Sequence, residues 1–188
     1  MKSFRPKPWL LPQPVLIIGT YDADGTPNAM NAAWGGECEM NEFIVSLGSH
    51  ATTDNLDRIG EFSLTFATVD TLVASDYVGL VSGRKVHDKV ARTGWKIEKG
   101  ENVNAPVFTD FPLTFECRMK AKINASEGEG YYLVGEIINI LCDEKYLAVD
   151  GKPDVEKMRL ISFDPIHNGY IELGKRVGNA FHDGLALK

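Results

Sequence analysis

The chain is poor in cysteine, and its three cysteines, Cys38, Cys117 and Cys142, lie far apart in the sequence. An odd number of cysteines without a C-x-x-C pair indicates neither a disulfide framework nor a zinc site. The four histidines also lack the spacing of a metal-binding motif such as H-E-x-x-H. We therefore expect no metal site, and we interpret the cysteines as ordinary thiols.

The chain also lacks an excess of positive charge and any long apolar run. Twenty Lys and Arg residues against twenty-six Asp and Glu residues give a net charge of −6, which argues against a nucleic acid partner. No apolar run approaches the ~20 residues that a membrane span needs. The proline-broken N-terminus has no apolar signal-peptide segment. These features predict a cytoplasmic protein that binds neither nucleic acid nor a membrane.

The sequence has no G-x-G-x-x-G loop and no strict β-α-β alternation, which argues against a doubly wound dinucleotide-binding fold. Its 188 residues suffice for one well-buried core but are few for two domains. We expect residues 1–188 to form a single domain. A C-terminal tail from about residue 165, rich in glycine, is expected to lie along its surface.

What the sequence does contain is a series of short apolar runs separated by turn signals. Asp22-Ala23-Asp24-Gly25 predicts a hairpin between residues 15–21 and 28–34, and Gly35-Gly36 then predicts a bend or bulge. The further strand candidates are residues 42–47, 62–67, 112–123, 131–142 and about 158–163, with a turn at 126–130. Six or seven strands of this kind predict a mainly β fold, a closed antiparallel barrel of Greek-key type with a few peripheral helices.

Two short helices are expected beside these strands. Thr52 or Thr53 could cap the first, which should stop at Gly60, and Asp70 could cap the second. The polar and basic segment at residues 82–100 is interpreted as a long loop with a helical turn.

Residues 28–55 carry the clearest candidate binding site. Small residues around Trp34 would let a flat ligand approach the backbone, and the hydroxyl and amide groups after Leu47 open a helix. Because a helix N-terminus with free N–H groups favours an anion, this pattern indicates a planar ring with a phosphate tail. Taken alone, the same residues fit a plain helix cap and a core tryptophan, and Lys89 fits a surface charge.

Five segments in order resemble the flavoredoxin branch of the flavin reductase-like family: PQPVLIIGTYDADGTPNAMNAAWGGEC, SLGSHATTDNL, DYVGLVSGRKVHDKVARTGW, DGKPDVEKM and YIELGKRVGNAF. The resemblance implies an FMN-binding split β-barrel, usually a homodimer with flavin near the subunit interface. It implies an oxidoreductase that passes electrons from NAD(P)H to flavin. The alternative is an FMN electron carrier between redox partner proteins, without direct NAD(P)H oxidation. A flavin-binding protein without redox turnover is the third interpretation.

The resemblance also implies the site residues. Asn31, Ala32, Ala33 and Trp34 stand where the family lines the flavin ring and its ribityl chain, with Ser46 and Leu47 on the next strand. The phosphate positions are Ser49, Thr52, Thr53 and Asn55, with Lys89 near the same site. The tail around Tyr170 is expected to approach the cofactor or the dimer partner. No catalytic side chain is expected, because flavin performs the chemistry itself.

Two positions depart from the family pattern. Gly48 and Ser49 stand where relatives often have Arg and Lys, so positive charge must come from Arg84, Lys85, Lys89 or the helix N-terminus. Gly130 stands where nicotinamide-using relatives have a histidine. This second departure argues against direct NAD(P)H oxidation.

Overall fold

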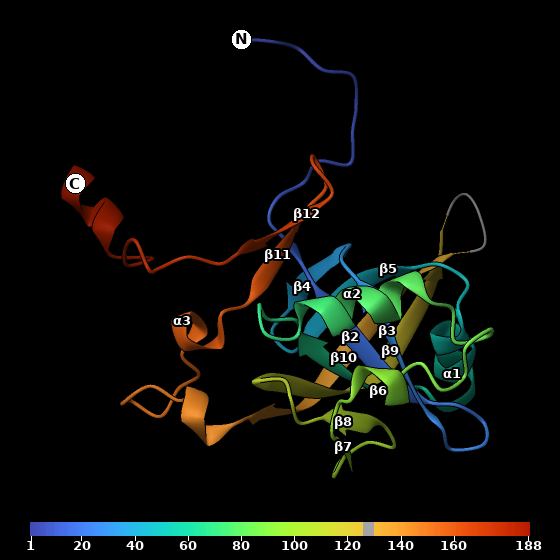
Figure 1. Ribbon diagram of the computed structural model, residues 1–188. Coiled ribbons are helices and arrows are strands. Elements are labelled where there is room, and N and C mark those ends of the chain that lie inside the picture. Colours follow the sequence, from blue (N-terminus) through green and yellow to red (C-terminus); the bar gives the residue numbers. More distant parts are fainter. Residues whose placement is uncertain (126–129) are drawn as a thin grey trace.

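The computed structural model describes residues 1–125 and 130–188. Its main feature is a seven-stranded antiparallel sheet with the strand order β3-β2-β6-β9-β10-β5-β4 (Figure 1). The strands are β2 (Leu16–Tyr21), β3 (Pro27–Ala32), β4 (Gly35–Glu39), β5 (Glu42–Leu47), β6 (Glu61–Phe66), β9 (Leu113–Asn124) and β10 (Tyr131–Cys142). The predicted antiparallel β architecture is confirmed.

This sheet keeps two edges, because β3 and β4 each pair with one strand only among the described residues. The edge strand β3 passes close to β5 without pairing to it. Such an edge presents backbone N–H and C=O groups that no neighbouring strand uses. The barrel is therefore open beside β3, where no pairing between the described strands closes the sheet.

Smaller elements surround the barrel. Strands β1 (Gln13–Pro14), β11 (Ile161–Asp164) and β12 (Gly169–Glu172) form a second sheet, and β7 (Ile97–Lys99) pairs with β8 (Pro106–Phe108). The helices are α1 (Ala51–Ile59), α2 (Leu72–Leu80) and α3 (Val155–Met158), with 3₁₀ turns η1 (Ala91–Thr93), η2 (Glu144–Tyr146) and η3 (Asp183–Leu187).

The core has two parts because both faces of β2 are buried. Successive side chains of a strand point to opposite faces. Ile18 accordingly packs in the barrel interior with Val45 and Phe62, while Ile17 packs on the other face with Val78 of α2 and Phe108 of β8. Helix α2 is thereby fixed against the outside of the sheet, next to β3.

The structure corrects several local predictions. Gly35-Gly36 is not a bend but the start of β4, where a Cβ on Gly35 would lie 2.7 Å from the Ile44 carbonyl oxygen. Helix α1 begins after His50 rather than at Thr52 or Thr53, and it ends at Gly60 as predicted, with φ of 71°. The predicted turn at residues 126–130 falls mostly outside the described residues.

The second helix and the C-terminal segment also differ from expectation. Thr71, not Asp70, precedes α2, because the hydroxyl of Thr71 is tied to the backbone and side chain of Thr68. The tail begins as strand β12, which pairs with β11. Beyond β12 it is exposed and runs away from the body of the molecule, as does the N-terminal segment (Figure 1).

Candidate functional site

A cleft of about 210 Å³ lies beside the edge strand β3. Its other walls are the start of α1, the C-terminal end of α2 and the loop that follows α2. The lining residues are Met30, Asn31, His50, Ala51, Thr52, Val78, Gly79, Leu80, Val81, Ser82, Gly83 and Lys89. Three of the predicted site residues, Asn31, Thr52 and Lys89, thus come together from separate parts of the chain.

Asn31 forms the β3 wall of the cleft. Its side-chain Nδ2 donates to the Ser75 carbonyl oxygen of α2 at 3.1 Å. Helix α2 approaches closely here, because a Cβ on Gly79 would lie 2.9 Å from the Asn31 Cβ. Glycine at this position lets the helix lie against the strand, and the amide of Asn31 is held between them.

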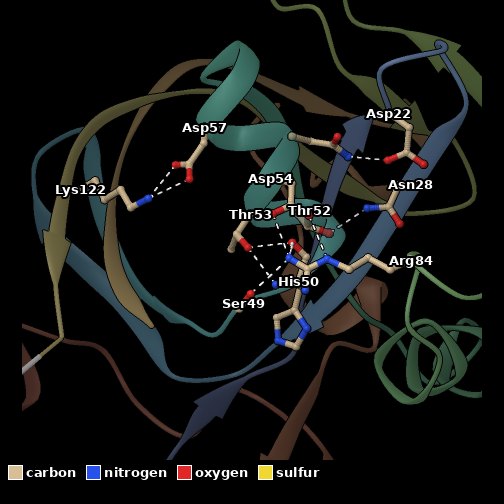
Figure 2. Close-up of polar contacts among 11 residues, drawn as sticks. Asp22, Asn28, Ser49, His50, Thr52, Thr53, Asp54, Asp57, Arg84 and Lys122 are labelled. Atoms are coloured by element: carbon tan, nitrogen blue, oxygen red, sulfur yellow. Dashed lines mark hydrogen bonds and ion pairs between the residues drawn. The ribbon is translucent and has the colours of Figure 1, made fainter. Parts of the chain in front are cut away.

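The start of α1 supplies hydrogen-bond donors to the cleft. The first backbone N–H groups of a helix have no partner within the helix and carry partial positive charge. Thr52 lies in this first turn and is 1% exposed. Its Oγ1 accepts a hydrogen bond from Asn28 Nδ2 at 2.8 Å (Figure 2). The hydroxyl hydrogen of Thr52 is therefore left to donate elsewhere.

Lys89 brings a buried positive charge to the same cleft. The residue is 3% exposed, and its Nζ donates to the carbonyl oxygens of Val78 and Val81, each at 2.9 Å. These carbonyls close the C-terminal end of α2, where a cation is favoured. Burial lowers the pKa of Lys89 to about 8. An ammonium has three donors, so one remains for a ligand.

Arg84 lies over the start of α1. Its guanidinium pairs with Asp54 at 2.9 Å and donates to Ser49 Oγ at 3.2 Å (Figure 2). The pKa of His50 is lowered, first by burial and then by the positive charges of Arg84 and Lys89. The positive charges of Arg84 and Lys89 thus act on the residue that precedes α1.

Aromatic rings extend this site beyond the cleft. Trp34 is 52% exposed, and its ring meets Phe163 of β11 edge-to-face with centroids 6.3 Å apart. Phe163 in turn lies 6.1 Å from the ring of Tyr170, and the Tyr170 hydroxyl donates to Asp76 Oδ1 of α2 at 2.6 Å. An exposed apolar wall therefore connects through Tyr170 to α2, the helix whose C-terminal end lines the cleft.

The other predicted site residues do not line the cleft. Ala32 and Ala33 are buried, Leu47 belongs to the barrel core, and Ser46 is exposed. The Ser46 backbone N–H donates to the Trp34 carbonyl at 2.8 Å.

Three predicted phosphate residues have their side chains engaged within the protein. Ser49 accepts from Arg84. Thr53 Oγ1 accepts from the His50 N–H and donates to the His50 carbonyl, each at 2.8 Å (Figure 2). Asn55 donates to Thr20 Oγ1 and Asp22 Oδ1 at 3.0 and 2.6 Å.

Sequence reasoning missed the wall formed by residues 78–83, together with Phe163 and Asp76. The apolar end of α2 carries no local signal of ligand binding, because its role arises from packing against β3. Asp76 accepts a hydrogen bond from the Tyr170 hydroxyl at 2.6 Å, across 94 residues of sequence. Only the fold brings such residues together.

These features fit a ligand with an anionic group and a flat apolar part. The helix N-terminus, the Thr52 hydroxyl and the Lys89 ammonium supply donors for a phosphate. The open edge of β3 offers backbone groups, and the Trp34–Phe163 pair offers an apolar surface. FMN has both parts, so the residues present fit this cofactor.

No group of three or more His, Cys, Asp or Glu side chains within residues 1–125 and 130–188 is placed to hold a metal ion. In the same part of the chain, no helix combines the length and apolar character that crossing a membrane requires.

Comparison with known proteins identifies relatives over the whole chain. Flavoredoxin of Desulfovibrio vulgaris (Miyazaki F) is 32% identical with a TM-score of 0.92, covering 98% of this chain and 99% of its own. Flavoredoxin of Methanosarcina acetivorans is 30% identical with a TM-score of 0.88, and both chains are fully covered. No curated protein matches.

A more distant structure and a family model agree with these matches. A Shewanella frigidimarina protein with a split barrel domain has a TM-score of 0.78 at 15% identity, over 90% of this chain and 86% of its own, and it shows the fold alone. The model of the flavin reductase like domain matches residues 10–152. The chain therefore belongs to the flavin reductase-like family and has its split-barrel fold.

Proposed function

We propose that this protein binds FMN with its phosphate in the cleft between α1, α2 and β3. The observation that carries the proposal is the convergence of Thr52, Lys89 and the helix N-terminus on one cleft beside an open strand edge. At neutral pH the phosphate has about −1.5 to −2 charges, which complements this set of donors. Bound flavin supplies hydride and electron transfer.

The protein groups then have distinct roles. Lys89 and Thr52 bind the phosphate, and Asn31 contacts the ribityl chain next to it. The Trp34–Phe163 pair covers the flavin ring, together with the neighbouring predicted residues Ala32, Ala33, Ser46 and Leu47. Ser49, Thr53 and Asn55 act indirectly, since their side chains hold Arg84, the start of α1 and the β2–β3 hairpin in place.

The reaction we propose is that of an oxidoreductase which passes electrons from NADH or NADPH to flavin. The family membership supports this assignment. The proposed location is the cytoplasm, which agrees with three free cysteines. As the family resemblance implies, we propose a homodimer. Apolar side chains on both terminal segments, including Phe4, Val177 and Phe181, are exposed and available for a second copy.

Gly130 favours a second candidate, an FMN electron carrier between protein partners. A Cβ at Gly130 would lie 2.7 Å from the Leu47 carbonyl oxygen, so a side chain here would require the end of β5 to move. The position that holds a histidine in nicotinamide-using relatives is therefore closed to one. Two flavoredoxins among the similar structures agree with this candidate.

Anaerobic reduction distinguishes the two candidates. The purified protein is loaded with FMN and mixed with NADH or NADPH, and flavin absorbance near 450 nm is followed (roughly the wavelength of oxidised flavin). Bleaching by either nucleotide on a time scale of seconds establishes the reductase. Bleaching by dithionite but by neither nucleotide establishes the carrier. If FMN does not bind at all, both candidates are wrong.

A further inference from the structure

Asn28 and Thr52 form a buried pair at the start of α1. Asn28 lies on β3 and is 2% exposed, and Thr52 lies in the first turn of α1 and is 1% exposed. The Asn28 Nδ2 donates to Thr52 Oγ1 at 2.8 Å (Figure 2). Thr52 lines the cleft, and Asn28 supports it from the β3 side.

The carbonyl oxygen of the same amide is buried against Gly83. Among residues 1–125 and 130–188, Asn28 Oδ1 is one of two buried side-chain oxygens that take part in no hydrogen bond. A Cβ on Gly83 would lie 2.6 Å from this oxygen, so the loop after α2 packs directly against the amide. A buried polar atom without a partner destabilises a fold and calls for an explanation.

The orientation of the Asn28 amide determines what the Thr52 hydroxyl can do. A hydroxyl has one hydrogen to donate. If the amide were reversed, its carbonyl oxygen could accept this hydrogen and would no longer lack a partner, but Thr52 would have no hydrogen for a ligand. In the orientation that the structure shows, Asn28 donates and the hydrogen of Thr52 is kept for the cleft.

We propose that Asn28 is a positioning residue that fixes Thr52 as a hydrogen-bond donor to the phosphate of FMN. A phosphate dianion offers only acceptor atoms, so every protein group that bonds to it has to donate. The inference rests on the proposed function and extends it to a residue behind the wall of the cleft. The unpartnered Asn28 oxygen is then the cost of holding a donor ready before the ligand binds.

A double-mutant cycle tests whether Asn28 acts through Thr52. Dissociation constants for FMN are measured by flavin fluorescence for the wild type, Asn28→Leu, Thr52→Val and the double variant. Leucine is close to asparagine in shape but forms no side-chain hydrogen bond. Asn28→Leu should weaken FMN binding about fivefold, the typical effect of one hydrogen bond, and should have no further effect in the Thr52→Val background. An equal loss in both backgrounds would overturn the proposal, as would wild-type affinity in Asn28→Leu.

Further variants and a second ligand make the result specific. In the Thr52→Ser background, which keeps a hydroxyl, Asn28→Leu should again weaken FMN binding about fivefold. Riboflavin, which has no phosphate, should bind Asn28→Leu and the wild type equally. Asn139→Leu removes a hydrogen bond to Glu116 at 2.9 Å outside the cleft and should leave FMN affinity unchanged. An equal loss with riboflavin, or in Asn139→Leu, would attribute the effect to the fold alone and overturn the donor role.

Inorganic phosphate separates this inference from the proposed function. In the flavin-free protein, phosphate should shift the backbone ¹⁵N NMR signals at the start of α1, with sodium chloride of equal ionic strength as the reference. Its dissociation constant should rise several-fold in Asn28→Leu and no further in the double variant. Equal constants in the wild type and Asn28→Leu would overturn the positioning role even if FMN binds. Phosphate binding that depends on Asn28, without FMN binding, would overturn only the proposed function, and binding of neither ligand would overturn both.

Discussion

Lys89, which taken without the family resemblance fits a surface charge, is buried and lines the cleft in which we propose that the phosphate binds. Its ammonium is held by two carbonyl oxygens at the end of α2 and faces the same cleft as Thr52. Burial disfavours the charged form and lowers its pKa to about 8. The charge that a phosphate needs is therefore present at neutral pH but is lost within the alkaline range.

FMN affinity should accordingly fall as the pH rises through about 8. Phosphate binds the protonated lysine, so above the pKa of the free protein binding requires proton uptake and weakens by up to tenfold per pH unit. Lys89→Met should weaken FMN binding roughly tenfold at pH 7 and abolish this alkaline dependence. Flavin titrations between pH 6 and 9 measure both effects.

This prediction has two controls, a ligand without phosphate and a second lysine on the same loop. Riboflavin, which has no phosphate, should bind with little change over this pH range and in Lys89→Met. Lys85→Met removes an exposed charge nearby and should retain the alkaline fall. A wild-type affinity that is constant from pH 7 to 9 would contradict the role of Lys89.

At the level of single elements, helix α1 is stabilised by a specific backbone arrangement at each of its two ends. At the start, Thr53 bonds to both backbone groups of His50, and at the end Gly60 takes a left-handed conformation with φ of 71°. The start of the helix is part of the cleft, so its geometry affects the site directly. The end is remote from the cleft and can be altered for a stability test.

Gly60→Ala should destabilise the protein by about 1 kcal/mol, because an L-residue is strained in the left-handed region. Gly36→Ala is the matched control: a Cβ meets nothing within 4 Å at either position, but the backbone of Gly36 is not left-handed. Urea unfolding should show a lower midpoint for Gly60→Ala alone, with an unchanged m-value. Equal effects of the two substitutions would show that the backbone conformation is not the cause.

The elements also show which features can be predicted from sequence. The bounds of β10 and the stop at Gly60 were predicted correctly, because a continuous apolar strand and a glycine after a helix are local signals. The short strands β7, β8 and β12 were missed, because each depends on a partner strand. Candidate residues from one stretch, such as Asn55, were found bonded to distant residues such as Thr20, which local sequence does not reveal.

At the scale of the whole molecule, the two terminal segments extend away from the barrel (Figure 1). Several of their apolar side chains are exposed, and Val177 at 101% and Phe181 at 103% are fully exposed. Apolar residues in this number are usually buried by a partner. A second copy of the chain that receives these segments would bury them.

Light scattering should therefore give a mass of twice 20.8 kDa in solution. Replacing both Val177 and Phe181 with serine should weaken the dimer and shift the mass toward the monomer on dilution. Val149→Ser serves as the control, since Val149 is as exposed as Val177 but lies in a loop outside the terminal segments. A monomeric wild type would contradict the proposal.

The open edge of β3 has a consequence for production of the protein. FMN bound beside this edge would cover its unused backbone groups and would stabilise the folded chain over the unfolded one. Cells starved of riboflavin should therefore yield more protein in inclusion bodies, and added riboflavin should return it to the supernatant. Vitamin supply during growth would then govern how much soluble protein can be recovered.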